Sequence, residues 1–322
     1  MNEFDIIERY FLPLTGGHPA ADGLRDDAAV LSIPDDHELV VTSDTLNENV
    51  HFMRGDNPEN IARKTLRVNL SDLASMGAKP LCYQLNIAFP ERPDDDWLLR
   101  FSRALKEDNE TYDIFCSGGD TTSIKGGFLS VSITAMGIVP KGKAVRRSGA
   151  KAGDHIVITG SVGDAYLGLK VLQNDLDLQK YASAVSRYYV PQPRMGIEGV
   201  LRKYVNAAAD ISDGFFADCM HIAKSSGLRA KIFDDKITFS KDVQLALDEG
   251  VATKVDVLSG GDDYELILAV SPENSDYMIR YLYKKQLNPM LVGEFLSNDS
   301  SLPLLSFGLL CIDDVNHGWE HF

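Results

Sequence analysis

The chain has few cysteines, and they are scattered. Cys82, Cys116, Cys219 and Cys311 are the only four in 322 residues, and no two form a Cys-x-x-Cys pair. This spacing argues against a structural zinc site, a dithiol redox motif and a disulfide framework. We therefore expect reduced cysteines that pack as small hydrophobic side chains.

Long hydrophobic runs are also missing. No stretch approaches the ~18 consecutive apolar residues that a membrane-spanning helix needs. The longest candidate, Phe128–Val139, is interrupted by Ser130 and Ser132 and is typical of a strand. The acidic beginning, Met1 to Asp5, lacks the basic segment and apolar run of a secretory signal. These absences predict a cytoplasmic protein that does not bind membranes.

Positive charge is scarce. The chain has 32 Lys and Arg residues against 47 Asp and Glu residues, a net charge of −15. Such a surface repels nucleic acid and anionic lipid, which bind basic patches. It also repels ATP, unless cations lie between the protein and the phosphates.

The composition is otherwise that of a globular protein, with 44% hydrophobic and 25% charged residues. Apolar periodicity alternates between two and about 3.6 residues, which predicts mixed α and β structure. A basic, glycine-containing connector covers Pro140–Gly153 and is the best candidate for a domain boundary. We therefore predict two α/β domains, residues 1–140 and 141–322.

The pattern also predicts the main elements. A helix begins at Pro58, with Asn57 as its cap, and ends at Gly77. The other expected helices cover Asp5–Phe11, a segment around Trp97–Leu105, Asp164–Leu172 and Leu178–Tyr189. The expected strands are Ala28–Ile33, Glu38–Ser43, Leu81–Phe89, Asp113–Ser117, Phe128–Val139, His155–Thr159, Ala207–Ile211 and Tyr264–Val270.

Aspartates recur in short segments beside these strands, often next to glycine or hydroxyl residues. The segments are Asp26-Asp27, Thr42-Ser43-Asp44-Thr45, Ser71-Asp72, Gly118-Gly119-Asp120, Asp210-Ile211-Ser212-Asp213-Gly214 and Gly260-Gly261-Asp262-Asp263. Each segment alone can be explained by the turn and cap preferences of Asp and Gly. As a set they indicate a site, because ligands of open α/β sheets gather at the carboxyl ends of strands. Asp72 lies instead inside a helix, where a solvent-facing position explains it equally well.

If these carboxylates converge, they need counter-charge. Two carboxylates ~4 Å apart repel by about 4 kcal/mol at an effective dielectric near 20. Mg²⁺ prefers hard oxygen ligands and bridges carboxylates to phosphate. In phosphoryl transfer, such ions screen charge and align donor with acceptor, so no covalent protein intermediate is required. The sequence thus predicts an ATP- and Mg²⁺-dependent enzyme.

Other phosphate-binding signals are weaker. The chain has neither a Walker A sequence nor a kinase-type glycine loop. The segment Gly160–Gly163 follows a strand and could cradle phosphate. The pair Arg146-Arg147 fits a phosphate clamp in a chain this acidic, and an exposed linker explains it nearly as well. His51 could contact substrate, and Trp319 could stack on a flat ring or pack a loop.

Taken in order, the motifs resemble the thiamine-monophosphate kinase family over essentially the whole chain. The matching segments are Asp26–Val30, Thr42–Thr45, His51-Phe52, Asn69–Ala78, Gly118–Thr122, Arg147–Lys151, Asp210–Gly214, Ser259–Leu266 and Gly318–Phe322. The resemblance implies a two-domain fold like that of aminoimidazole ribonucleotide synthetase, whose amino-terminal domains pair in a homodimer. It also implies that ATP and thiamine monophosphate give ADP and thiamine diphosphate by direct in-line transfer.

The resemblance implies roles for individual residues. The Mg²⁺ ligands would be Asp27, Thr42, Ser43, Asp44, Asp72, Asp120, Asp210 and Asp213. The ATP contacts would be Gly119, Asp120, Arg147 and Ser212. The substrate contacts would be His51, Asp262 and Trp319, the last by stacking on a thiamine ring. No catalytic side chain is implied, because the metal ions assist the transfer.

The chain departs from the family pattern in three places. Arg25 stands where the family usually has glycine, Asp262 where it has glutamate, and Ala152 where proline is common. The first two bear on the geometry of the site but not on the reaction class. The alternatives are another ATP-using enzyme of this architecture and a Mg²⁺-dependent phosphohydrolase that activates water with the same aspartates.

Overall fold

The computed structural model describes residues 3–173, 176–299, 301, 303–308 and 310–312. The chain divides into two compact units. Unit 1 comprises Met1–Leu73 and Ala78–Lys143, and unit 2 comprises Ala74–Gly77 and Ala144–Phe322. Within the described ranges, no helix combines the length and the apolar character needed to cross a bilayer.

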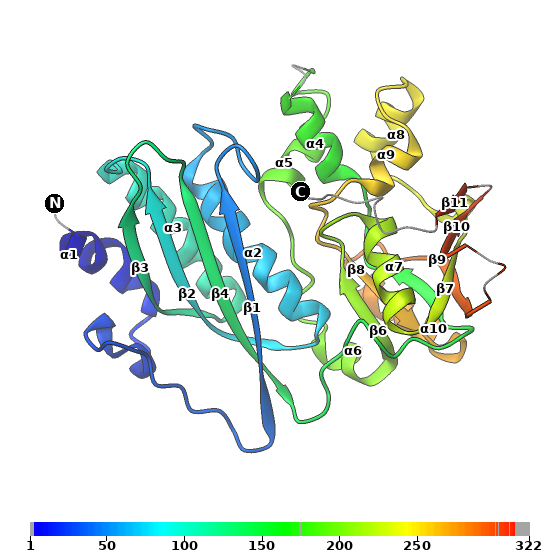
Figure 1. Ribbon diagram of the computed structural model, residues 1–322, viewed down its shortest axis with the longest axis horizontal. Coiled ribbons are helices and arrows are strands. Elements are labelled where there is room, and N and C mark those ends of the chain that lie inside the picture. Colours follow the sequence, from blue (N-terminus) through cyan, green and yellow to red (C-terminus); the bar gives the residue numbers. More distant parts are fainter. Residues whose placement is uncertain (1–2, 174–175, 300, 302, 309, 313–322) are drawn as a thin grey trace. The chain divides into compact units, whose positions relative to one another are not determined.

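Unit 1 is built on a four-stranded sheet with the strand order β1-β4-β2-β3. The strands are β1 (His37–Asn47), β2 (Lys79–Phe89), β3 (Phe115–Ser123) and β4 (Ser130–Pro140). Only the β2–β3 pair is parallel. The helices α2 (Pro58–Ser75) and α3 (Asp95–Tyr112) cover one face of this sheet (Figure 1). The short helices α1 (Glu3–Ile6), η1 (Ile7–Phe11), η2 (Leu12–Thr15) and η3 (Pro19–Leu24) precede it, and η2 and η3 contact β3.

Alternation along the strands gives this sheet one buried and one open face. On β4, Val131, Ile133 and Ala135 are buried, and the residues between them are only partly so. On β1, Leu39 and Val41 belong to the open face and are 40% and 55% exposed. They pair across the strands with Ile138 and Met136 respectively. The open face therefore carries apolar side chains that no described residue of unit 1 covers.

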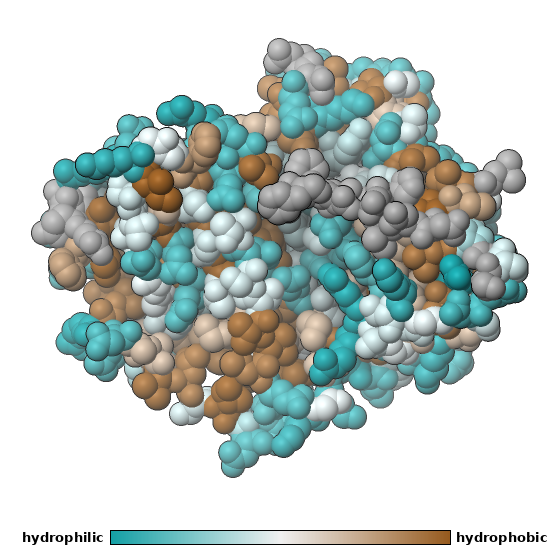
Figure 2. All heavy atoms as spheres, viewed as in Figure 1, coloured by the Kyte–Doolittle hydropathy of each residue, from teal (hydrophilic) through white to brown (hydrophobic). Residues whose placement is uncertain are grey.

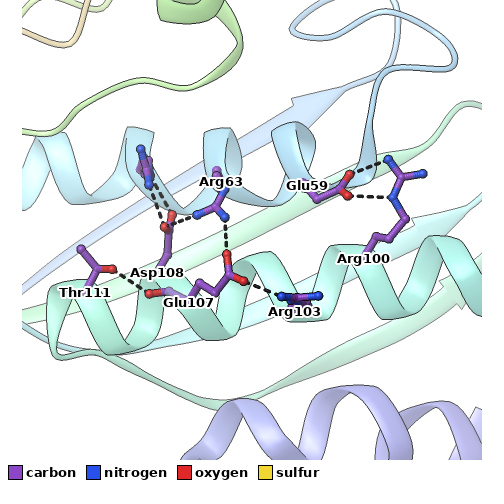
Figure 3. Close-up of polar contacts among 8 residues, drawn as sticks. Glu59, Arg63, Arg100, Arg103, Glu107, Asp108 and Thr111 are labelled. Carbon is purple, nitrogen blue, oxygen red and sulfur yellow. Dashed lines mark hydrogen bonds and ion pairs between the residues drawn. The ribbon is translucent and has the colours of Figure 1, made fainter.

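A buried ion network joins α2 to α3 (Figure 3). Asp108 on α3 is fully buried and accepts two hydrogen bonds from Arg67, each 2.7 Å long. Arg63, one helical turn before Arg67, donates to Asp108 at 2.8 Å and to Glu107 at 2.5 Å. Because one buried carboxylate accepts from both arginines, the network sets the position of α2 against α3.

Unit 2 contains a seven-stranded sheet with the order β11-β10-β7-β9-β5-β8-β6. Its strands are β5 (His155–Ile158), β6 (Val205–Asp210), β7 (Leu228–Ile232), β8 (Leu266–Val270), β9 (Met290–Ser297), β10 (Leu305–Phe307) and β11 (Leu310–Ile312). Its helices are α4 (Asp164–Gln173), α5 (Ala182–Tyr189), α6 (Glu198–Tyr204), α7 (Phe215–Ser225), η4 (Asp234–Lys236), α8 (Lys241–Asp248), α9 (Lys254–Ser259) and α10 (Pro272–Lys284). Strand β8 is buried along its whole length, as a central strand covered on both faces must be.

The two-domain, mixed α/β class predicted from the sequence is confirmed, but three local expectations are wrong. Residues 28–33 form no strand, because this segment is largely exposed and pairs with nothing in a sheet. Asp44 lies inside β1 and not after it, since the strand continues to Asn47. Gly118-Gly119-Asp120 likewise lies inside β3, because Thr121 and Thr122 extend the strand.

Candidate functional site

The first group of predicted ligands lies where β1 meets α2. The Thr42 hydroxyl donates a short hydrogen bond to the carboxylate of Asp72 on α2. Asp44 lies two residues after Thr42 on the same strand, so its side chain points to the same, helix-covered face. Beside Asp72, the buried Asn69 donates to the Thr65 carbonyl oxygen at 3.0 Å. The structure thus brings Thr42, Asp44 and Asp72 to one face of the sheet.

Ser43 does not join them through its side chain. Its hydroxyl lies on the open face and is 3.0 Å from the hydroxyl of Thr134 on β4. One residue further on, the hydroxyl of Thr45 is 2.7 Å from that of Ser132. From the sequence, Thr42 and Ser43 were both predicted Mg²⁺ ligands, but strand alternation places their side chains on opposite faces of the sheet.

A second group surrounds a cavity of about 330 Å³ at β3. Its walls include Asp26 and Asp27 from the loop after η3, and Gly119 and Asp120 from β3. A side chain at position 119 would place its Cβ only 1.8 Å from the Leu85 carbonyl oxygen, so glycine is required there. The volume falls at the small end of the range for ligand pockets. The predicted contacts Asp27, Gly119 and Asp120 therefore line one cavity.

The two groups lie at opposite edges of the same sheet. Strands β1 and β3 are separated by β4 and β2. Three spacings of ~4.8 Å amount to about 14 Å. One residue from each strand forms a row across the open face of the sheet. In the order of the strands from β3 to β1, these residues are Asp120, Asn86, Ser132 and Thr45. Asp44 lies on the other face. One Mg²⁺ ion cannot bind both groups within a single copy of unit 1, because its ligands lie about 2 Å from the ion.

His51 belongs to the tight turn that follows β1. Its Nδ1 accepts a hydrogen bond from the Asn47 amide at 3.1 Å, so the proton of the neutral ring is on Nε2. The buried Lys64 on α2 donates to the His51 carbonyl oxygen at 3.0 Å. Hydrogen bonds to both the ring and the carbonyl oxygen of His51 therefore hold the turn in place.

In unit 2, the predicted ligands lie at the end of β6. Asp210 is the last residue of this strand and is 2% exposed. Ser212 and Asp213 follow in the turn before α7, and Gly214 is the N-cap residue of that helix. Asp218, in the first turn of α7, accepts hydrogen bonds from the amides of Ser212 and Asp213 at 3.0 and 3.1 Å. The chain thus places two predicted metal ligands on either side of a predicted ATP contact.

Asp213, Asp218 and His221 form a further group whose potential ligand atoms lie within 4.8 Å of one another. Burial and, next, the negative charge of Asp213 raise the pKa of Asp218 to about 7, against the opposing charge of Arg147. Burial, with a contribution from Arg147, lowers the pKa of His221. The charge of Arg147 therefore acts on two side chains of α7, one of which accepts the amides of Ser212 and Asp213.

Asp262 lies in a loop connected to this turn. Its amide donates to the Ser212 carbonyl oxygen at 2.9 Å, and its carboxylate accepts from the Tyr264 hydroxyl at 3.0 Å. The following Asp263 is buried, and burial raises its pKa to about 8. Its carboxylate accepts the amides of Gly163 and Ala165. The loop that could have cradled a phosphate therefore already binds a carboxylate of the chain.

Glu265 supports the same loop from inside unit 2. Its fully buried carboxylate accepts from Arg187 at 3.0 Å, from Arg194 at 2.6 Å and from the Thr159 hydroxyl at 2.6 Å. Arg187 also donates to the Asp263 carbonyl oxygen at 3.1 Å. Although burial raises the pKa of Glu265, the two arginines hold it below its ordinary value.

The Arg25 side chain bonds back to the Asp22 carbonyl oxygen at 3.2 Å, and its φ of −105° does not require glycine. Trp319 lies outside the described residues. Sequence reasoning overlooked Asp218 and His221, and it named Asp263 within a motif but gave it no role of its own. The signal for Asp218 was an aspartate in the first turn of a helix that follows an aspartate-glycine turn, where a carboxylate binds exposed amides.

The sequence of the chain matches a known protein family and several known proteins. Residues 25–139 match the family described as AIR synthase related protein, N-terminal domain. The chain is 36% identical to the thiamine-monophosphate kinase of Salmonella typhimurium over 324 residues, covering 99% of this chain and 98% of that protein. It is 40% identical to the enzyme of the same name from Caulobacter vibrioides over 276 residues, covering 85% and 78% of the two chains.

Solved structures agree in fold. A crystal structure of thiamine-monophosphate kinase from Stenotrophomonas maltophilia K279a matches with a TM-score of 0.83 and 36% identity, covering 92% of this chain and 95% of that one. AaThiL complexed with AMPPCP and TMP matches with a TM-score of 0.78 and 26% identity, covering 99% and 97%.

Proposed function

Because the chain belongs to the thiamine-monophosphate kinase family, we propose that it transfers the γ-phosphate of ATP to thiamine monophosphate and so forms thiamine diphosphate. The enzyme class rests on the relatives, and AaThiL binds an ATP analogue together with TMP. The observation in this chain that carries the proposal is the turn after β6. There Asp210 and Asp213 flank Ser212, and the charge of Arg147 acts on Asp218, which accepts amides of the same turn.

The donor atoms fit Mg²⁺. The predicted ligands offer carboxylate and hydroxyl oxygens, which are the hard ligands this ion prefers. They form three sets: Asp27 with Asp120, Thr42 with Asp44 and Asp72, and Asp210 with Asp213. When bound, Mg²⁺ would neutralise the phosphate oxygens and stabilise the charge that develops during transfer.

The residues of the chain bind and orient the two substrates in this proposal. Arg147 offers a planar guanidinium to the ATP phosphates. Gly119 lines the cavity at β3 with its backbone, and Ser212 offers a hydroxyl. His51, in the tautomer with its proton on Nε2, can donate a hydrogen bond to thiamine monophosphate. Asp262 and Trp319 complete the predicted substrate contacts.

No protein nucleophile is needed. A phosphate oxygen of thiamine monophosphate attacks the γ-phosphorus of ATP, and the bond between that phosphorus and the bridging oxygen breaks. The electron pair leaves with ADP. The attacking group is already an anion at neutral pH, so no side chain has to remove a proton. The protein contributes alignment and electrostatic stabilisation.

We also propose that the enzyme is a homodimer in which unit 1 pairs through its open sheet face. The exposed side chains of Leu39 and Val41 pair with the partly buried Ile138 and Met136 and give this face an apolar area. Figure 2 shows brown surface over the region of β1 and β4. The separation of the β1 and β3 groups supports the same idea. Within one copy the two groups are about 14 Å apart, but in a homodimer the β3 group of one copy could lie beside the β1 group of the other.

Product analysis tests the reaction. The purified chain is incubated with Mg²⁺, ATP and thiamine monophosphate, and the products are separated by chromatography. We expect equal amounts of ADP and thiamine diphosphate, with no product when EDTA replaces Mg²⁺. Release of free phosphate without thiamine diphosphate would identify the phosphohydrolase instead. An absence of any ATP turnover would reject both enzymes.

A further inference from the structure

Unit 2 contains two places where backbone N–H groups converge as they do around a bound phosphate. One is the turn Ser212-Asp213-Gly214, and the other is the amino-terminal end of α4. Convergent amides of this kind bind anions in many proteins. In this chain a buried aspartate fills each of them.

Asp218 fills the first. Its Oδ2 accepts the amides of Ser212, Asp213 and Gly214 at 3.0, 3.1 and 3.3 Å, three successive donors to one oxygen. The side chain is fully buried, and its Oδ1 has no hydrogen-bond partner among the described residues. Gly214 has a φ of +125°, and a Cβ there would lie 2.4 Å from the Ser259 carbonyl oxygen. The turn therefore requires glycine at position 214, and one oxygen of Asp218 accepts its three successive amides.

Asp263 fills the second. Its Oδ2 accepts the Gly163 amide at 2.5 Å, and its Oδ1 accepts the Ala165 amide at 3.1 Å. Both donors belong to the first turn of α4 or directly precede it. Asp263 is 2% exposed, so its carboxylate occupies the place that a phosphate would need.

The backbone around Asp263 is held in a costly conformation. The residues on both sides, Asp262 and Tyr264, have φ values of +69° and +52°. Residues other than glycine disfavour positive φ, so surrounding contacts must maintain this backbone conformation. Besides the two α4 amides, the bond from Arg187 to the Asp263 carbonyl oxygen contributes. The result is a fixed direction for the Asp262 side chain.

We propose that Asp218 and Asp263 are positioning residues, each of which holds one loop of the site from within. Asp218 orders the turn that carries Ser212 and Asp213. Asp263 orders the loop that carries Asp262. The inference rests on the proposed function, because it assigns Mg²⁺ and ATP to the first loop and thiamine monophosphate to the second. It also means that neither of these two groups of converging amides binds a nucleotide phosphate.

The two roles predict that each variant weakens the binding of a different ligand. Asp218→Ala should raise the Mg²⁺ concentration for half-maximal activity by about tenfold or more, as losses of groups that orient metal ligands do. Its KM for thiamine monophosphate should stay within about twofold. Asp263→Ala should raise the KM for thiamine monophosphate by about tenfold and leave the Mg²⁺ requirement within about twofold. Each variant is the control for the other, since both remove a buried carboxylate from the same unit.

The asparagine variants separate the two geometries. Only one oxygen of Asp218 accepts amides, so Asp218→Asn keeps an acceptor in place and should restore most of the Mg²⁺ affinity. Both oxygens of Asp263 accept amides. Asp263→Asn therefore turns an NH₂ group toward the amide of Gly163 or Ala165 and should behave like Asp263→Ala. If only the loss of a buried carboxyl group mattered, the two asparagine variants would behave alike.

The experiment measures ligand binding as well as turnover. Full-length wild type and variants are titrated by calorimetry with Mg²⁺ in the presence of AMPPCP, and separately with thiamine monophosphate. Circular dichroism checks folding, and the asparagine variants decide if an alanine variant does not fold. Selective loss of Mg²⁺ affinity in one variant and of thiamine monophosphate affinity in the other supports the proposal. Equal losses in both, or none, would overturn it. A wild type that binds these ligands without forming thiamine diphosphate rejects the proposed function, but the binding data still decide the positioning roles.

Discussion

The Thr42 hydroxyl on β1 donates a hydrogen bond to the Asp72 carboxylate on α2. This contact joins residues 30 positions apart and brings a helical aspartate to the strand that carries Asp44. It argues against one of the two explanations that the sequence left open for Asp72, because the side chain is directed at the sheet and does not simply face solvent. Its role as a metal ligand stays a prediction.

Replacing Asp72 by asparagine should abolish most of the activity. The amide keeps the size of the side chain but offers Mg²⁺ only one neutral oxygen. We expect kcat/KM to fall by more than about 100-fold, or roughly 2.7 kcal/mol of transition-state stabilisation. The initial rate of thiamine diphosphate formation at saturating Mg²⁺ measures this. Asp113→Asn is the control, because Asp113 is an exposed helix cap in the left-handed region, which asparagine tolerates. Near-normal turnover by Asp72→Asn would remove Asp72 from the metal ligands.

The Arg147 guanidinium should matter for ATP and not for thiamine monophosphate. Removing it in Arg147→Ala takes away a charged contact to phosphate, so we expect the KM for ATP to rise by about tenfold or more. Steady-state kinetics with each substrate varied in turn would show this. Arg146→Ala is the matched control, because the neighbouring side chain is also exposed and carries the same charge. Equal effects of the two substitutions would point to general electrostatics in place of a specific contact.

Asp108 should be essential for the stability of unit 1. In Asp108→Asn, Arg63 and Arg67 lose the charge that both of them bind. Removing one partner of a buried ion pair costs about 3–5 kcal/mol in the free energy of unfolding. Urea denaturation followed by circular dichroism measures the change. Glu107→Gln should cost no more than about 1 kcal/mol, because that side chain is 46% exposed. Similar midpoints for the two variants would contradict the assigned role of burial.

Glu265 should make unit 2 sensitive to acid. Its pKa is lower in the folded chain than in the unfolded one, because Arg194 and Arg187 stabilise the carboxylate against the cost of burial. The unfolded state therefore takes up the proton first as the pH falls. The stabilisation is complete above the unfolded pKa of about 4.3 and is lost progressively below it.

Urea denaturation between about pH 3 and pH 7 tests this dependence. Wild type should lose stability more steeply below about pH 4.3 than Glu265→Gln, which cannot titrate. At neutral pH the variant should be less stable by about 3–5 kcal/mol, because its arginines lose their buried partner. The difference between the two curves removes the shared contribution of other carboxyl groups. Parallel curves would show that Glu265 has the same pKa in both states.

The open face of the unit 1 sheet should be the dimer interface. Val41→Glu places a charge at the centre of its apolar area and should shift the protein from dimer to monomer, which sedimentation velocity detects. Leu99→Glu on α3 is the matched control, since Leu99 is 56% and Val41 55% exposed. Dissociation by Leu99→Glu alone, or a monomeric wild type, would refute the interface.

The order of the motifs along the chain was enough to identify the family, and composition and charge led us to expect no binding to nucleic acid or membranes. Strong local signals also predicted elements correctly. Helix α2 begins at Pro58 and ends before Gly77, whose φ is +65°. Such signals act within a few residues, so they can be read from one segment at a time.

What the tertiary structure decided was which residues share a face and which amides already have an acceptor. Thr42 and Ser43 are neighbours in sequence, but the strand sends them to opposite faces, while Asp72 comes from a distant helix to meet Thr42. Gly160–Gly163 has the composition of a phosphate loop, but Asp263, 100 residues after Gly163, fills it. Contacts between distant segments depend on register and packing of the whole unit, and no local pattern records them.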